Sequence, residues 1–174
     1  TSDISNALTD RLSIIEALLP QLEKDVLDLQ GTSNAKKTKT NIFDLVTEAD
    51  LHSEKIITSA IQKHFPKDAI LAEEGTNSGA QDSESFTWVI DPIDGTVNYA
   101  NSLHHWGISV GIIYQNTPVA GIVSAPSLNK RYRAIKGHGA TKNGDPIQVS
   151  IKSLLSEGVI VTGFPYDRAI RAEH

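Results

Sequence analysis

The chain has 174 residues, a formal net charge of −5 and 39% hydrophobic residues, as in an ordinary soluble globular protein of one domain or slightly more. It has no basic stripe for nucleic acid, no apolar stretch long enough to cross a bilayer, and no cysteine for disulfides or thiolate metal sites. By default we expect a cytoplasmic protein without a nucleic-acid or membrane partner.

The first segment has leucine, isoleucine or valine at alternating steps of four and three between residues 8 and 29. This spacing predicts one amphipathic helix, which Pro20 should kink but not end, because the pattern keeps its phase across the proline. The stripe could serve as an oligomerisation seam. A helix packed on a core is the favoured interpretation, since the pattern stops at Gly31. Residues 31–41 are polar and predict a loop.

A second helix is indicated between Thr47 and Pro66. Thr47 can cap it, and acidic residues in its first turn suit the helix dipole. Its buried face is predicted to hold Ile56, Ile57, Ala60, Ile61 and Phe65.

Short apolar runs after this helix predict a mainly antiparallel sheet. The expected strands are 69–72, 87–90, 107–114, 119–125, 131–136 and 147–149, with hairpin turns at 115–118 and 127–130. The class is therefore α+β, with residues 1–150 as an amino-terminal domain. Residues 151–174 should begin a second domain that is largely missing, with a new element starting at 158–162. The absence of methionine and the charged end at His174 suggest an incomplete gene product.

Acidic residues stand where two predicted strands end. Asp91 and Asp94 lie three residues apart around Pro92, and Glu73-Glu74 follows the neighbouring strand. Converging carboxylates repel one another unless a cation lies between them, and oxygen ligands without histidine or cysteine suit magnesium before calcium or zinc. Ordinary turn chemistry is the competing interpretation of an isolated Asp-Pro-x-Asp-Gly motif.

The order of motifs resembles the inositol monophosphatase family of lithium-sensitive, magnesium-dependent phosphatases. That family has an aspartate, then Glu-Glu, then Asp-Pro-(Ile/Leu)-Asp-Gly-Thr, and later Trp-Asp and Gly-Gly. This chain matches them in order with Asp44, the pair Glu73-Glu74 and the string from Asp91 to Thr96. No Trp-Asp pair follows, because Trp88 and Trp106 are followed by other residues.

The resemblance implies a layered α/β sandwich of the inositol monophosphatase type and a Mg²⁺ cofactor. Glu73, Asp91 and the backbone carbonyl of Ile93 are expected to hold a first magnesium, while Asp91 and Asp94 share a second. Glu73 and the Thr96 hydroxyl should then position and deprotonate an attacking water.

The remaining implied roles concern the residues around those ligands. Asp44 is expected to accept a hydrogen bond from Thr96. Asp94 and the backbone amides of Gly95 and Thr96 are expected to bind the phosphate, and Glu74 to steer Glu73 or a metal-bound water. The lysine cluster at 36–39 is interpreted as a solvated loop in preference to a lid, and His104 and His105 as structural.

The implied activity is magnesium-dependent hydrolysis of a small polyol or sugar phosphate ester by a phosphoric monoester hydrolase. Inositol phosphate, fructose bisphosphate and histidinol phosphate all remain open as substrates, and relatives commonly form homodimers. The alternative is a non-catalytic or split module that binds metal and phosphate, because the missing Trp-Asp would complete the second metal site.

Overall fold

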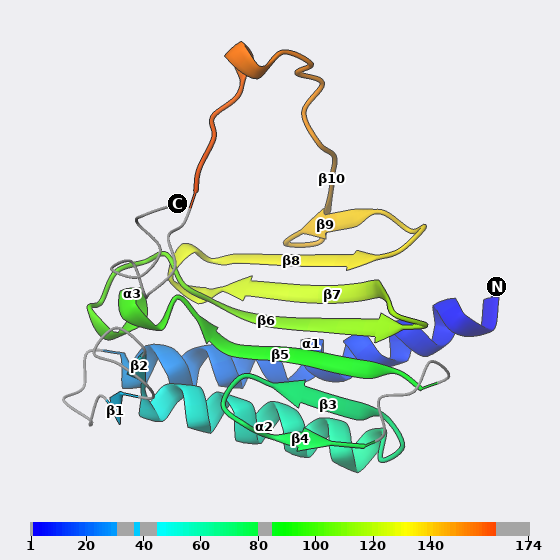
Figure 1. The fold of residues 1–174 in the computed structure, drawn as a ribbon, viewed down its shortest axis with the longest axis vertical. Helices are drawn as coiled ribbons and strands as arrows, with labels where there is room; N and C mark the ends of the chain where they lie inside the picture. Colours follow the sequence, from blue (N-terminus) through cyan, green and yellow to red (C-terminus); the bar gives the residue numbers. More distant parts are fainter. Residues whose placement is uncertain (1, 31–36, 39–44, 80–84, 163–174) are drawn as a thin grey trace, which may run out of the picture.

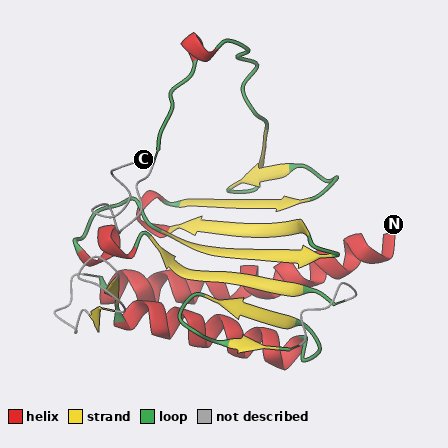
Figure 2. Cartoon of the chain, in the orientation of Figure 1, coloured by secondary structure: helices red, strands yellow, loops and turns green. Residues whose placement is uncertain are grey.

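The computed structural model describes residues 2–30, 37–38, 45–79 and 85–162. Two long helices lie against one face of an eight-stranded sheet (Figure 1, Figure 2). The sheet has the order β10-β9-β8-β7-β6-β5-β3-β4, and only β3 and β5 pair in parallel among these strands. The predicted α+β class, with two helices on a mainly antiparallel sheet, is confirmed.

Helix α1 (Ser2–Leu29) continues through Pro20, as its pattern predicts. Its apolar stripe is buried against the rest of this chain, so the packed-helix interpretation is confirmed. The six stripe residues that are at most 3% exposed are Leu8, Leu12, Ile15, Leu19, Leu22 and Val26.

Helix α2 (Glu48–His64) begins where Thr47 predicts. The Thr47 backbone N–H donates to Asp50 Oδ2 at 2.8 Å, and the Thr47 hydroxyl donates to the same oxygen. The buried side of α2 differs from the predicted apolar face, because it includes the polar residues Asp50, Ser53 and Glu54 beside Ile57 and Ile61. Ile56 and Phe65 are only partly buried against the core.

The strands largely follow the predicted runs. Their bounds are β1 (Lys37–Thr38), β2 (Leu45–Val46), β3 (Ala69–Ala72), β4 (Asn77–Ser78), β5 (Thr87–Asp94), β6 (Gly107–Tyr114), β7 (Thr117–Ala125), β8 (Lys130–Ile135), β9 (Ala140–Lys142) and β10 (Asp145–Ile147). Short helices are α3 (Thr96–Ala100), η1 (Pro126–Leu128) and η2 (Leu155–Glu157).

Three predicted boundaries were wrong. β5 does not end before Asp91 but continues to Asp94, and β10 ends at Ile147 instead of starting there. Residues 158–162 form no helix or strand, so no new element begins there within the described chain.

The hairpin turns were predicted correctly. Gln115 and Asn116, with φ of 50° and 55°, join β6 to β7, and Asn129 in the left-handed region precedes β8. No helix within the described ranges has the length and apolar character needed to span a membrane.

Candidate active site

The carboxyl ends of β3 and β5 lie side by side in the sheet. Ala72 is in register with Ile90, and the Glu73 backbone N–H donates to the Ile90 carbonyl at 3.0 Å. Residues at the same level of paired strands face the same side, so Glu73 lies beside Asp91. The two carboxyl side chains share a hydrogen bond.

A β-bulge in β5 brings Asp94 to the same face as Asp91. In a regular strand, residues three apart point to opposite faces. Here Asp91 is opposite Ser109 and Asp94 is opposite Gly107, with a register shift between the two pairs. Because Ser109 and Gly107 are two apart on β6, their partners share a face, as one extra bulge residue requires.

Asp91 lies in a strongly acidic environment. Burial, the negative charge and hydrogen bond of Glu73, and the charges of Asp94 and Asp50 together raise the pKa of Asp91 to about 7. Its Oδ1 atom is buried and has no hydrogen-bond partner. A buried carboxylate oxygen without a donor is costly, so this atom is open to a cation or a proton.

The Thr96 hydroxyl is held between two acceptors. Its Oγ1 lies 3.2 Å from Asp50 Oδ1 and 3.0 Å from the Ile93 carbonyl oxygen. Burial raises the pKa of Asp50, and the hydrogen bonds from Thr47 and Thr96 oppose that rise. Asp44, which was expected to accept from Thr96, lies outside the described residues. Among the described residues, Asp50 and the Ile93 carbonyl are the acceptors, and the Asp44 contact stays a prediction.

Gly95 makes the tight connection between β5 and α3. Its φ is +85°, and a Cβ at this position would lie 3.0 Å from the His105 carbonyl oxygen. Only glycine fits both the left-handed backbone and the close approach. Gly95 therefore separates the exposed Asp94 from Thr96 by a single, tightly turned residue. The phosphate-binding role of the Gly95 and Thr96 amides stays a prediction. Helix α3, with only 5 residues, is too short to support that role by itself.

The other expected residues lie around this centre. Glu73 is exposed and Glu74 is half-buried in the turn after β3. His104 and His105 are exposed in the loop after α3, and the His105 carbonyl accepts a hydrogen bond from Asn98 at 2.6 Å. Nothing in this arrangement gives either imidazole a catalytic partner among the described residues.

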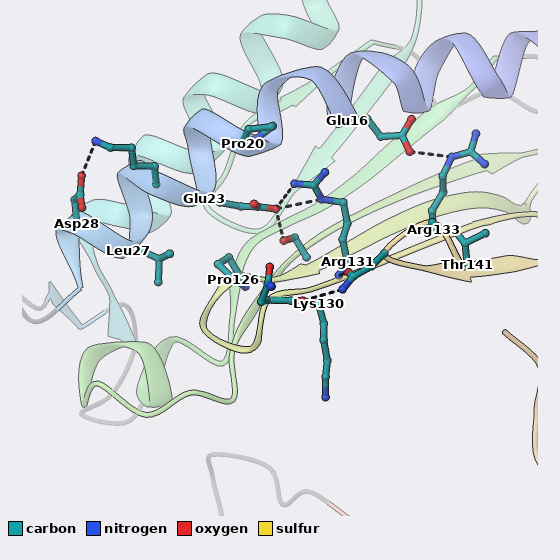
Figure 3. Close-up of a pocket in the computed structure, with 15 residues that line it drawn as sticks. Glu16, Pro20, Glu23, Leu27, Asp28, Pro126, Lys130, Arg131, Arg133 and Thr141 are labelled. Carbon is teal, nitrogen blue, oxygen red and sulfur yellow. Dashed lines mark hydrogen bonds and ion pairs between the residues drawn. The ribbon is translucent and has the colours of Figure 1, made fainter. Parts of the chain in front are cut away.

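A separate groove of about 960 Å³ lies between α1 and strands β7 to β9 (Figure 3). Both of its arginines are already paired, with Arg131 2.7 Å from Glu23 and Arg133 3.1 Å from Glu16. Neither Glu73 nor Asp91 lines it. The groove is thus distinct from the acidic centre.

Comparison with known proteins agrees with this geometry. The model of the inositol monophosphatase family matches residues 12–174. The chain belongs to the inositol monophosphatase family. An inositol-1-monophosphatase of Synechocystis sp. is 42% identical over 144 residues, covering 83% of this chain and 50% of that protein. The Nus factor SuhB of Pseudomonas aeruginosa is 35% identical over 71% of this chain and 46% of its own length.

Solved structures show the same family fold. A Thermotoga maritima IMPase superposes with a TM-score of 0.74 at 35% identity, covering 82% of this chain and 54% of that one. An IMPase/NADP phosphatase complexed with Mg²⁺ and phosphate gives 0.71 at 29% identity, covering 80% and 53%. The chain therefore spans about half the length of these family members, and its homologues are phosphoric monoester hydrolases.

The acidic centre fits the metal dependence of the inositol monophosphatase family. Its donors are carboxylate and carbonyl oxygens, the set that hard divalent cations prefer, and Asp91 Oδ1 has no other partner. Among the described residues, no three Asp, Glu or His side chains are gathered closely enough to hold a metal as they stand.

Sequence reasoning missed the residues that α2 contributes. Asp50 was noted only for the helix dipole, and Ser53 and Glu54 were not singled out. The available signal was their spacing, because positions 50, 53, 54, 57 and 61 lie on one side of a helix. Polar residues in a stripe that also holds Ile57 and Ile61 indicate buried polar contacts.

Proposed function

We propose that the protein containing this chain is a magnesium-dependent phosphatase that hydrolyses phosphate monoesters of small polyols or sugars. The observation that carries the proposal is the contact between Glu73 and Asp91, with Asp94 on the same face and Asp91 Oδ1 buried without a donor. The family relationship supports a phosphatase, and the solved relative with Mg²⁺ and phosphate supports the choice of cation.

The chain offers ligands for two adjacent cations. Glu73, Asp91 and the Ile93 carbonyl would hold one Mg²⁺, and Asp91 with Asp94 would hold part of a second. The Ile93 carbonyl already lies 3.0 Å from Thr96 Oγ1, and its second lone pair remains for a cation. Bound Mg²⁺ would lower the pKa of a coordinated water and offset phosphate charge.

Thr96 and Asp50 would handle the proton of the attacking water. By donating its own proton to Asp50 Oδ1, Thr96 Oγ1 keeps a lone pair directed elsewhere, which can accept a proton from a neighbouring water. Glu73, which follows the adjacent end of β3, would orient the same water. Positioning of this kind supplies much of the catalysis in phosphoryl transfer.

The phosphate would lie beyond the end of β5. The backbone amides of Gly95 and Thr96 are proposed to bind its oxygens, with Asp94 contacting it through the second cation. Glu74 is proposed to steer Glu73 or a bound water. These assignments rest on the family resemblance and on the position of the four residues at the ends of β3 and β5.

Further properties of the whole protein remain proposals. We propose inhibition by lithium, a homodimer and a cytoplasmic location. We expect no nucleic-acid partner, a point that the relative named Nus factor SuhB makes worth testing. The second candidate function is a module that binds metal and phosphate without turnover; this chain itself has no Trp-Asp pair.

Phosphate release by the intact protein tests the proposal. The substrate panel contains inositol monophosphate, fructose bisphosphate and histidinol phosphate, each with Mg²⁺ or with EDTA. We expect release only with Mg²⁺, and a loss of about a hundredfold or more in kcat/KM for Asp91→Asn, because that variant removes charge from the centre. Asp145→Asn, at the exposed far edge of the sheet, is the control.

Two results would contradict the proposal. Release that is unchanged in EDTA would rule out the metal mechanism, and full activity of Asp91→Asn would rule out this centre. Metal binding without turnover of any ester would favour the non-catalytic module.

A further inference from the structure

Helix α2 presents three buried polar side chains to the acidic centre. Asp50, Ser53 and Glu54 are 1%, 0% and 5% exposed, and each contacts a different segment of the site. Asp50 accepts from Thr96, and the Ser53 hydroxyl donates to the Pro92 carbonyl at 3.2 Å. Glu54 contacts the turn that carries Glu73.

Both oxygens of the Glu54 carboxylate accept hydrogen bonds from that turn. Its Oε2 accepts from the Glu74 backbone N–H at 2.8 Å. Its Oε1 accepts from the Thr76 backbone N–H at 3.1 Å and from the Thr76 hydroxyl at 2.6 Å. Both oxygens of Glu54 are thus directed at this turn.

The turn itself is tight. The Gly75 N–H donates to the Ala72 carbonyl at 3.3 Å, and the Ala72 N–H donates to the Thr76 carbonyl at 3.2 Å. Gly75 has a φ of +113°, which glycine adopts readily. The Glu73 side chain projects from the beginning of this short turn. Glu54 binds the residues that follow it in the turn, Glu74 and Thr76.

The same helix fixes the second strand end. Ser53, next to Glu54, binds the Pro92 carbonyl directly after Asp91. Adjacent positions on α2 thus hold the turn after β3 and the bulge in β5. Packing alone does not call for an acidic residue at position 54, because burial of a carboxylate costs free energy that an apolar side chain would not.

We propose that Glu54 is a positioning residue that fixes Glu73 against Asp91 by holding the Glu74–Thr76 turn, and so sets the affinity of the centre for divalent cations. The inference rests on the proposed function, since it assigns Glu54 a role in a metal site. Substitutions of residues that orient metal ligands typically weaken metal binding by about 10- to 100-fold.

Glu54→Gln in the intact protein is the main test. Its amide oxygen can still accept from Thr76, but its NH₂ group would face the Glu74 N–H, so one hydrogen bond is lost. We expect amide hydrogen exchange at Glu74 without metal to quicken about tenfold. In calorimetric titration with Mn²⁺, we expect the dissociation constant to rise about tenfold. At saturating Mg²⁺, kcat should stay within about threefold of wild type, because the ligands themselves are intact.

Three further variants separate positioning from stability. Thr76→Val removes only the hydroxyl and should weaken Mn²⁺ binding less than Glu54→Gln, while Thr76→Ser should restore it. Glu48→Gln changes an exposed acid on the same helix and should bind Mn²⁺ as wild type does. Ile61→Val removes a methyl group from a core residue of α2 and so lowers stability, but it leaves the turn unchanged. It should also leave Mn²⁺ affinity unchanged.

Unchanged Mn²⁺ affinity in both Glu54→Gln and Thr76→Val would overturn the inference, even if both were less stable. An equal loss of affinity in Ile61→Val would overturn it too, because general destabilisation would then suffice. A wild-type protein that binds no Mn²⁺ would instead contradict the proposed function. If Glu54→Gln does not fold, the comparison of Thr76→Val with Thr76→Ser decides the question.

Discussion

At the scale of single residues, two aspartates of the acidic centre differ in how their oxygens are paired. Asp50 accepts from the Thr47 backbone, the Thr47 hydroxyl and the Thr96 hydroxyl. Asp91 has one buried oxygen with no donor and an acidic neighbour hydrogen bonded to it. The first arrangement fixes the orientation of Thr96, and the second leaves an oxygen for a cation. The two aspartates therefore have different roles although both are acids at the same centre.

Thr96→Val tests the role given to the threonine hydroxyl. The variant keeps the shape of the side chain but can neither donate to Asp50 nor accept a proton from water. We expect kcat of the intact protein to fall about a hundredfold, the low end for loss of a positioned acid–base group. Thr96→Ser, which keeps the hydroxyl, should retain most of the activity. A kcat within about threefold of wild type for Thr96→Val would exclude the role.

At the scale of elements, α1 is tied to the sheet by a buried ion pair far from the acidic centre. Arg11 donates to Asp68 through Nε at 2.7 Å and Nη2 at 2.8 Å, and Trp88 Nε1 donates to the same carboxylate at 2.8 Å. The guanidinium lies 4.4 Å and 3.8 Å from the ring centres of Phe65 and Phe86. This cluster holds the start of β3 against α1, at the end opposite Glu73.

Asp68→Asn should therefore destabilise the fold without acting on the centre directly. It leaves Arg11 buried without its negative partner, which costs about 3 kcal/mol or more in the free energy of unfolding. The matched control is Asp28→Asn, which breaks the exposed pair of Lys24 and Asp28 at 3.0 Å and should leave the free energy of unfolding nearly unchanged. Urea unfolding of both variants measures the difference, and equal costs would contradict the account.

Local patterns predicted the elements well, and long-range contacts account for most of what they missed. The stripe of α1, the cap at Thr47 and the turn at Gln115 can all be recognised within a few residues. The extension of β5 through Pro92 could not be predicted, because a proline inside a strand normally argues against that assignment and a bulge has no reliable sequence signal.

The functional site was predicted only in part, because it too depends on contacts between residues far apart in the sequence. The acids after β3 and β5 were identified because they end apolar runs, and the family resemblance assigned their roles. The expected contact between Asp44 and Thr96 lies outside the described residues and stays a prediction, and the contact of Thr96 with Asp50, 46 positions away in the sequence, was not foreseen. From the sequence alone, Glu54 cannot be distinguished from an exposed acid on the surface of a helix. Its role becomes visible only from the packing of α2 on the turn after β3.

At the scale of the whole molecule, the sheet separates a packed face from a face that carries the acids. Trp88 and Ile90 on β5 are buried on the side of the helices. Val89 and Asp91 face the other side, where Leu71 is 41% and Val123 is 43% exposed. The chain spans about half of its relatives' length, and in the function proposed above it contributes the ends of β3 and β5, the bulge in β5 and the contacts from α2.

The central claim is that Glu73, Asp91 and Asp94 hold divalent cations, and anomalous diffraction from crystals of the intact protein soaked in Mn²⁺ tests it most directly. The account predicts a Mn²⁺ peak bonded to the Asp91 and Glu73 carboxylates, with the hydrogen bond between them broken. Crystals at saturating Mn²⁺ that show no peak at this centre, with that hydrogen bond intact, would contradict it.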